Sequence, residues 1–277
     1  MIGVFDSGHG GLTVLRALVR HLPARDFLYF GDHAHAPYGE RTPAEIVALT
    51  REAVHLLFAR GCRLVVLACN TAAAVALRTL QQEWLPQHAP DHRILGVLVP
   101  TVEAVTGVPW ATTHSVSHTG PLRTLAVFAT RRTVATNAYP EEIVKRAPGI
   151  VLVQQACAGL VHLIEGNAVR DVLAAAVRGH VAALREQLDG RKLDAVMLGC
   201  THYPLVADLF AEALPPEIEV VSQPEIVARS LADYLRRHPA LDASSSGRVA
   251  FLTSGDPQAV SLLGSTFYGD AVTFTKV

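Results

Sequence analysis

Residues 64–71 read LVVLACNT and residues 195–201 read AVMLGCT, so the chain presents one short pattern twice. In each stretch an apolar run ends in a small residue and a cysteine, Cys69 or Cys200, with a threonine close behind. Nearly uninterrupted apolar runs are typical of parallel strands that helices cover on both faces. Because ligands bind beyond the carboxyl ends of such strands, both thiols are predicted to lie at ligand sites.

The rest of the chain alternates short apolar runs with longer stretches of helical periodicity, which predicts an α/β fold with mainly parallel sheets. Residues 109–121 and 240–247 lack any period, and we predict an exposed loop and a surface turn there. Strands are predicted at 2–5, 27–30, 64–68, 94–98, 125–129, 150–153, 195–198, 218–221 and 249–252, and helices at 12–21, 43–60, 72–84, 169–188, 205–214 and 226–237.

The composition favours a protein that acts on a small molecule. The 277 residues exceed the usual size of one domain, and half of them are hydrophobic, so a large core can form. The formal net charge is -1 and no basic stripe occurs, which argues against a nucleic-acid partner. No signal peptide, membrane span or disulfide framework is recognisable, and the four cysteines are sparse. These features predict a reduced, cytoplasmic protein without a membrane partner.

Two opposed thiols suit the inversion of a stereocentre. Cys69 precedes the predicted helix near Ala72, and Cys200 precedes one that Pro204 would open. A thiol at a helix start meets the positive end of the helix dipole, so we expect a lowered pKa and thiolate character. One cysteine could then remove an α-proton while the other delivers a proton to the opposite face. We interpret Cys62 and Cys157 as structural thiols.

Polar neighbours of the two cysteines extend this hypothesis. Residues 6–11 read DSGHGG, a turn whose glycines let backbone amides approach an anionic group. Asp6 could cap that turn, bind a substrate ammonium or assist a cysteine. His202 lies two residues after Cys200 and could stabilise its thiolate or relay its proton. A Cys-x-His pair can also bind zinc, but no CxxC or HExxH motif accompanies it, and no metal is expected.

Four motifs together resemble the glutamate racemase family of the aspartate/glutamate racemase superfamily. They are DSGHGGLTV at 6–14, YFGDHAHAPYGER at 29–41, ACNTAAA at 68–74 and GCTHYPLV at 199–206, and the resemblance runs from residue 2 to about 256. It implies two α/β domains related by pseudo-symmetry, 1–97 plus 210–277 and 98–209, with the active site in the cleft between them. It also implies cofactor-free racemisation of glutamate for peptidoglycan synthesis, often by a homodimer.

The resemblance assigns roles residue by residue. Cys69 would remove the proton from D-glutamate and Cys200 from L-glutamate, with Asp6 and His202 assisting catalysis. Asp32 and Glu165 match acidic positions that are possible further assistants. The chain departs from the family where Arg132 replaces a glycine beside Thr133, and residues 109–121 resemble an insertion. The substrate-binding positions implied are Asp6, Ser7, Pro37, Tyr38, Gly39, Cys69, Asn70, Thr71, Thr133, Cys200, Thr201 and His202.

Three alternatives remain open at this point. A racemase of aspartate or another small amino acid would share both cysteines, although the APYG and GCTHYP motifs favour glutamate. A binding module that kept the fold but lost catalysis would be expected to lack a cysteine or Asp6, and all are present. A zinc-dependent hydrolase would need further ligands beside Cys200 and His202.

Overall fold

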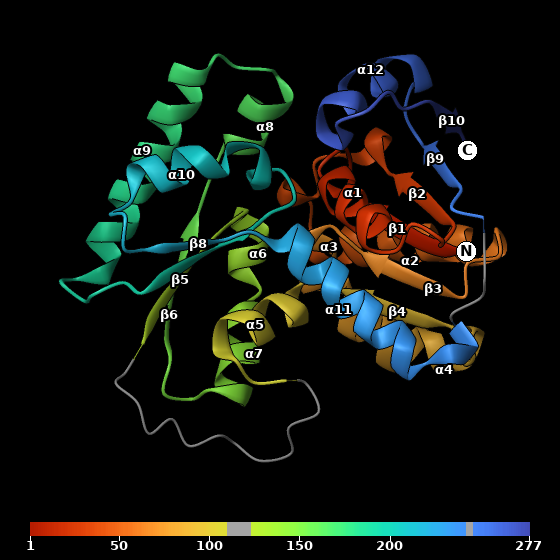
Figure 1. Ribbon diagram of the computed structural model, residues 1–277, viewed down its shortest axis with the longest axis horizontal. Coiled ribbons are helices and arrows are strands. Elements are labelled where there is room, and N and C mark those ends of the chain that lie inside the picture. The colour runs from red at the N-terminus through yellow and green to blue at the C-terminus, as the bar shows by residue number, and fades with distance from the viewer. Residues whose placement is uncertain (110–122, 242–245) are drawn as a thin grey trace. The chain divides into compact units, whose positions relative to one another are not determined.

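The chain folds as two compact units, each built on its own parallel sheet. The computed structural model describes residues 1–109, 123–241 and 246–277 (Figure 1). The first unit comprises residues 1–97 and 224–277, and the second comprises residues 98–223. The prediction of two parallel-sheet α/β domains is thereby confirmed. All but the first residue of the predicted loop 109–121 lies outside the described residues, as does the centre of the predicted turn 240–247.

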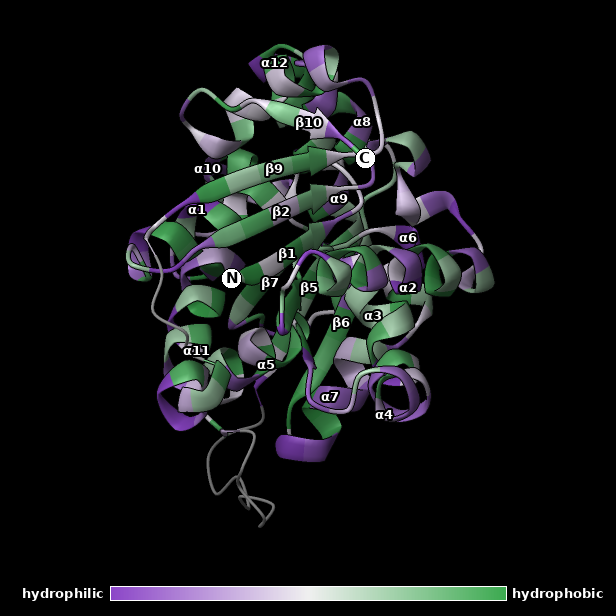
Figure 2. Cartoon of the chain, turned by 90° about the vertical axis from the view of Figure 1, so that its right-hand side faces the viewer, coloured by the Kyte–Doolittle hydropathy of each residue, from purple (hydrophilic) through white to green (hydrophobic). Residues whose placement is uncertain are grey.

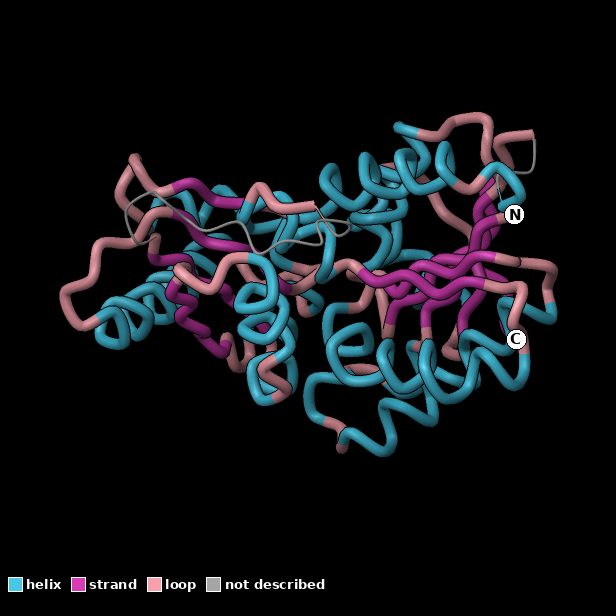
Figure 3. Tube along the Cα trace, turned by 90° about the horizontal axis from the view of Figure 1, so that it is seen from below, coloured by secondary structure: helices cyan, strands magenta, loops and turns pink. Residues whose placement is uncertain are grey.

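The first unit has a six-stranded sheet of order β10-β9-β2-β1-β3-β4, parallel throughout. Helices lie on both sides of these strands (Figure 3). Its strands are β1 (Ile2–Asp6), β2 (Phe27–Gly31), β3 (Leu64–Leu67), β4 (Arg93–Gly96), β9 (Val249–Thr253) and β10 (Phe274–Lys276). Its helices are α1 (Gly11–His21), α2 (Pro43–Ala59), α3 (Asn70–Thr79), α4 (Leu85–His88), α11 (Gln223–Arg237, whose first residue belongs to the second unit) and α12 (Pro257–Tyr268), with short turns η1 (His33–His35), η2 (Tyr38–Glu40), η3 (Leu80–Trp84, π-helical) and η5 (Pro239–Leu241).

Burial of the strands on both faces explains their composition. Every residue of β1, β2 and β3 is buried, and β2 and β9 are drawn largely in the hydrophobic colour in Figure 2. Helix α2 begins where its sequence predicts, because Thr42 and Glu45 form a capping box and Pro43 occupies the first turn. Local sequence and core packing therefore specify the same elements in this unit.

The second unit has a four-stranded parallel sheet of order β6-β5-β7-β8. All six residues of β5 and all five residues of β7 are buried. Among the described helices of both units, none combines the length and apolarity needed to cross a bilayer. The elements are β5 (Thr124–Ala129), β6 (Val151–Ala156), β7 (Ala195–Gly199) and β8 (Glu219–Val221), with α5 (Leu98–Thr106), α6 (Arg131–Ala135), α7 (Ala138–Arg146), α8 (Leu160–Glu165), α9 (Arg170–Leu188), α10 (Ala207–Ala213) and the 3₁₀ turn η4 (Tyr203–Val206).

The two sheets share one topology. In the first, β2 pairs on one side of β1, and the chain then crosses so that β3 pairs on the other side and β4 follows. In the second, β6, β5, β7 and β8 repeat this order. Ligands bind where such a strand order reverses, which is beyond the carboxyl ends of β1 and β3 and of β5 and β7. Cys69 follows β3 and Cys200 follows β7, so the sequence repeat reflects a repeat of topology.

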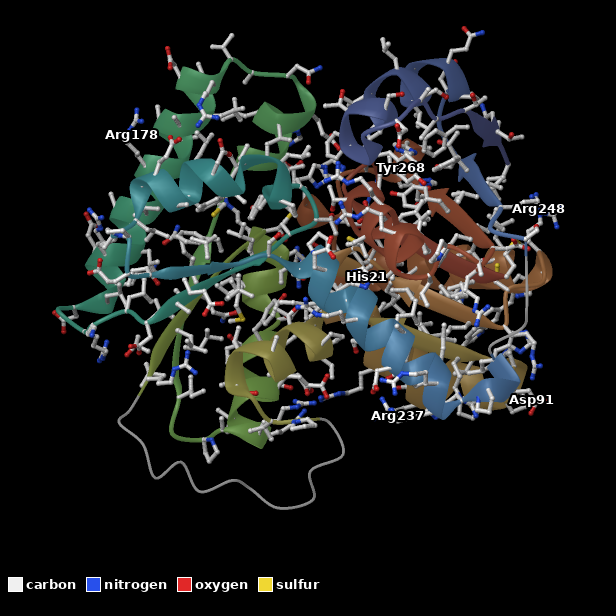
Figure 4. All side chains as sticks on the ribbon, in the orientation of Figure 1. His21, Asp91, Arg178, Arg237, Arg248 and Tyr268 are labelled. Carbon is white, nitrogen blue, oxygen red and sulfur yellow. The ribbon has the colours of Figure 1, made fainter. Side chains whose placement is uncertain are left out.

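The chain passes between the two units twice, and one of these two boundaries differs from the prediction. The first crossing, after Val97, lies where it was predicted, but the return comes at Pro224 and not at residue 210. Residues 210–223 stay in the second unit because β8 pairs with β7. From Glu225 onward the chain is tied to the first unit, since Glu225 contacts Arg20 and its Oε2 lies 2.7 Å from Nε2 of His21 on α1 (Figure 4).

Gly11, the first residue of α1, is required by a close approach. A Cβ there would lie 2.5 Å from Cβ of Asp6 and 3.0 Å from Oη of Tyr29. We expect Gly11→Ala to lower the free energy of unfolding by about 1–3 kcal/mol, because the extra carbon overpacks a tight turn. Urea denaturation measures this change.

Gly179 on α9 supplies the matched control. Nothing lies within 4 Å of a Cβ placed there, and alanine is the better helix former. Gly179→Ala should therefore stabilise the chain by about 0.5–1 kcal/mol. Equal effects of the two substitutions would contradict the close-approach argument.

Candidate active site

Cys69 lies at the start of α3, beyond the carboxyl end of β3. It is the N-cap residue, and its Sγ accepts a hydrogen bond from the backbone N–H of Ala72 at 3.4 Å. Ser7 Oγ, beyond the end of β1, lies 3.5 Å from the same sulfur. The predicted juxtaposition of the first glycine-rich turn with Cys69 is thus present.

The predicted thiolate character of Cys69 is wrong for this state of the protein. Burial raises the pKa of Cys69 to about 12, and the charge of Asp6 adds to that increase. The hydrogen bonds from Ala72 and Ser7 act in the opposite direction but do not overcome burial. Desolvation outweighs the helix start because the thiol is only 6 % exposed. At neutral pH Cys69 therefore holds its proton.

Asp6 fills one of the roles considered for it, the capping of the glycine-rich turn. The carboxylate is fully buried, and its Oδ1 accepts a hydrogen bond from the N–H of Gly8 at 2.8 Å, so it caps the turn. Its charge also acts on Cys69. The backbone carbonyl of Asp6 accepts from the N–H of Asp32 at 3.0 Å, which joins the ends of β1 and β2.

Asp32 holds the loop that carries Tyr38. Oη of Tyr38 donates to Oδ2 of Asp32 at 2.7 Å, while Oδ1 accepts from Oγ of Ser254 at 2.6 Å and lies 2.8 Å from Nδ1 of His35. Tyr38 is buried, and both Asp32 and Cys69 raise the pKa of its phenol after burial itself. Asp32 therefore supports the Pro37–Gly39 loop.

Cys200 occupies the equivalent place in the second unit, beyond the carboxyl end of β7. The segment that follows differs from the prediction, because Pro204 opens the 3₁₀ turn η4 and α10 begins only at Ala207. Cys200 is therefore not at the N-terminus of an α-helix. Its charged neighbour comes instead from a side chain, His202.

His202 links Cys200 to Glu165. Its Nδ1 lies 3.8 Å from Sγ of Cys200, and its Nε2 lies 2.8 Å from Oε1 of Glu165, the last residue of α8. Burial alone would lower the pKa of His202, but hydrogen bonds to Cys200 and Glu165 outweigh it and raise that pKa to about 10. The imidazole is therefore protonated at neutral pH. A protonated imidazole beside a thiol favours the thiolate form of that sulfur.

Thr133 lies in the same unit, beyond β5. Thr130 is the N-cap of α6, and its Oγ1 accepts from the N–H of Thr133 at 3.2 Å. The register pairs Ala129 with Gly199, so Thr130 and Cys200 continue neighbouring strands. Arg132 is half-buried, and its Nε makes no hydrogen bond to any residue that the structure describes.

The remaining predicted residues fall into the same two groups. Asn70, Thr71 and Thr201 are buried beside the two cysteines in sequence, and Pro37 and Gly39 flank Tyr38. Within residues 1–109, 123–241 and 246–277, no three His, Cys, Asp or Glu side chains gather as metal ligands would. The first group is Asp6, Ser7, Asp32, Pro37, Tyr38, Gly39, Cys69, Asn70 and Thr71, and the second is Thr133, Glu165, Cys200, Thr201 and His202.

Two further residues of the second unit lie near Cys200: Cys157, interpreted above as a structural thiol, and Tyr203, to which the sequence analysis gave no role. Cys157 follows β6. Burial raises the pKa of its thiol, and the charge of Cys200 adds to that increase. Tyr203 is fully buried. The position of Cys157 directly after an apolar run was the available signal, since Cys69 and Cys200 share it. Cys62 lies at no strand end, and burial raises its pKa to about 11, as suits a structural thiol.

The Glu165–His202 pair predicts a pH-dependent contribution to folding. The pKa of His202 is raised above its unfolded value of about 6.5, so its stabilisation is full below pH 6.5. It is lost as the pH rises from 6.5 through about 10. Glu165→Gln should lower the pKa of His202 by about 1–2 units, because an opposite charge is removed.

NMR titration of the His202 imidazole measures that shift. His180 on α9 is the internal control, because burial lowers its pKa and Glu165 is not among the groups that perturb it. The difference in unfolding free energy between wild type and Glu165→Gln should narrow between pH 6.5 and 10. An unchanged His202 titration would contradict the ion pair.

Comparison with known proteins identifies the family. Residues 2–231 match the Asp/Glu/Hydantoin racemase family. The chain belongs to this family. A glutamate racemase from Phenylobacterium zucineum is 48% identical over 99% of the chain and 98% of its own length, and one from Ruegeria pomeroyi is 48% identical with the same coverage.

Solved structures of the Asp/Glu/Hydantoin racemase family share this fold. A glutamate racemase from Bacillus anthracis superposes with a TM-score of 0.85 at 26% identity, covering 100% of this chain and 97% of its own. A glutamate racemase from Francisella tularensis, solved with D-glutamate, gives the same TM-score and identity over 100% and 96%. An aspartate racemase from Picrophilus torridus reaches 0.54 at 15% identity, covering 87% of this chain and 97% of its own, which shows the fold alone.

Proposed function

We propose that this chain interconverts L-glutamate and D-glutamate without a cofactor, with Cys69 and Cys200 as the two bases. The observation that carries the proposal is the repeat. In each sheet, a buried cysteine with a charged neighbour lies beyond the carboxyl end of a strand, at the point where the strand order reverses. Asp6 accompanies Cys69 and His202 accompanies Cys200. Relatives at 48% identity over nearly the full length are named glutamate racemases, which supports the choice of substrate.

The proposed reaction moves one proton in and one proton out. With L-glutamate, Cys200 takes the α-proton as a thiolate and Cys69 delivers its own proton to the opposite face. Afterwards Cys200 is a thiol and Cys69 a thiolate, which is the state that accepts D-glutamate. The overall charge is unchanged, and the reverse reaction uses the same groups. Both cysteines must reach one α-carbon for this reaction to occur.

The charged partners suit these starting states. Burial and then the charge of Asp6 raise the pKa of Cys69, so Cys69 begins as the proton donor. The protonated His202 beside Cys200 favours negative charge on that sulfur. A substrate ammonium next to Asp6 would offset the carboxylate charge and so ease proton loss from Cys69. The alternative roles of Asp6 and His202 as direct substrate ligands are compatible with this arrangement.

The substrate-binding residues proposed are neutral donors suited to two carboxylates. Ser7, Thr133 and Thr201 offer hydroxyls, and Asn70 and Thr71 lie in the first turn of α3, where backbone N–H groups and the helix dipole favour an anion. The Pro37–Gly39 loop, held by Asp32, adds Tyr38 to this set.

The setting follows from the same proposal. D-glutamate is a building block of peptidoglycan, so we place the enzyme in the cytoplasm, where that synthesis begins. Association into a homodimer is also proposed, and light scattering of the purified chain tests it against a monomer.

Substitution of either base provides the decisive test. We expect Cys69→Ala and Cys200→Ala each to reduce racemisation by about 10²–10⁴-fold, the usual contribution of a positioned acid or base. Solvent-deuterium incorporation at the α-carbon should be lost from D-glutamate in Cys69→Ala and from L-glutamate in Cys200→Ala. Chiral chromatography measures racemisation, and mass spectrometry measures the deuterium.

Cys62→Ala is the matched control, because Cys62 is buried in the first unit and precedes β3, away from its carboxyl end. It should keep wild-type turnover. Near-normal racemisation by either of the other variants would refute the two-base assignment. Turnover of aspartate but not glutamate by the wild type would favour the alternative substrate, and absence of α-proton exchange with any amino acid would favour a binding module.

A further inference from the structure

Tyr203 has a buried hydroxyl that lacks a hydrogen-bond partner among the described residues. The side chain is 0 % exposed, and its ring packs on Phe210 with centroids 5.9 Å apart. Its Oη is not in hydrogen-bonding geometry with any residue that the structure describes. Leaving a buried hydroxyl without a partner is costly, so this group should acquire one in the working protein.

Two sulfur atoms are the groups with which this hydroxyl interacts. Burial raises the pKa of Tyr203 far above its ordinary value, and the neighbouring charges of Cys200 and Cys157 raise it further. The phenol therefore keeps its proton and is always a donor. Its position is fixed at the backbone, where the N–H of Tyr203 donates to the carbonyl of Cys200 at 3.1 Å.

Cys157 is placed to share this donor with Cys200 but not to form a disulfide with it. Cys157 follows β6 and Cys200 follows β7, and β5 separates these strands. Two strand spacings put the Cα atoms about 10 Å apart, beyond the roughly 7 Å limit for a disulfide. Sγ of Cys157 lies 3.8 Å from the carbonyl oxygen of Gln155, which leaves the sulfur able to accept.

We propose that Tyr203 is a positioning residue that donates its hydroxyl hydrogen to Sγ of Cys200 when that sulfur is a thiolate, and shares it with Cys157 when Cys200 is protonated. This inference rests on the proposed role of Cys200 as a base. A thiolate is a stronger hydrogen-bond acceptor than a thiol, so the hydroxyl donates to Sγ of Cys200 when that sulfur is charged. Tyr203 thereby lowers the free energy of the thiolate without contacting the substrate.

Other titratable groups also face Cys200, and the test must separate them from Tyr203. His202 and, through it, Glu165 lie on one side. Tyr139 on α7 is influenced by the charge of Cys200, but its Oη accepts from Nε2 of Gln223 at 3.0 Å. Tyr139→Phe therefore removes a neighbouring buried hydroxyl of a different hydrogen-bond network and serves as the matched control.

The experiment follows the alkylation of Cys200 by iodoacetamide as a function of pH in the full chain, read for each cysteine by peptide mass spectrometry. In Tyr203→Phe the midpoint for Cys200 should rise by about 1–2 pH units, the effect of losing a hydrogen bond to a charged acceptor. In Cys157→Ala the midpoint should fall, because the competing acceptor is gone. In Tyr139→Phe it should stay at the wild-type value.

Opposite shifts in Tyr203→Phe and Cys157→Ala distinguish donor sharing from a loss of packing, which would move both midpoints the same way. An unchanged midpoint in Tyr203→Phe, or shifts of equal sign, would overturn the proposal. If Tyr203→Phe fails to fold, Cys157→Ala decides, since a midpoint that does not fall contradicts sharing. Alkylation requires no turnover, so failure of α-proton exchange would reject the proposed function and leave this test intact.

Discussion

Burial of ionisable groups at the carboxyl ends of two parallel sheets is the constraint on which this protein depends. The thiols of Cys69 and Cys200 lie where water is largely excluded, with 6 % and 5 % of their surface exposed. In such surroundings a single neighbouring charge has a large effect on the protonation state of a sulfur, because solvent screens it weakly. The fold creates these positions through strand reversals, and the surrounding side chains then determine which sulfur holds a proton.

The two cysteines lie in similar backbone settings but beside different charges. A carboxylate, Asp6, lies near Cys69, whereas a protonated imidazole, His202, lies near Cys200. The neighbours of these two chemically identical groups thus carry charges of opposite sign before any substrate arrives. Groups whose environments separate their protonation states are the usual basis for acid and base roles in one site.

The sequence specified the parts of this structure that depend on local pattern. All nine predicted strands are present, with β1, β2, β3, β5 and β7 buried on both faces, and α2 starts at its capping box. The three-residue strand β10 was not predicted, since Phe274 is its only buried residue. The protonated state of Cys69 was also missed, because desolvation depends on the packing of distant segments. Tyr203 and Cys157 came together only through the order β6-β5-β7, which motif spacing does not reveal.

The position of β9 in the first sheet has a consequence for synthesis of the chain. β9 pairs with β2, but more than two hundred residues of the chain separate them, including the whole second unit. While the ribosome is still producing residues 98–223, the backbone edge of β2 has no neighbour on that side. Open strand edges promote association between chains, so the nascent protein is exposed to that hazard until its last segment emerges. A chain released before Val249 would retain this open edge permanently.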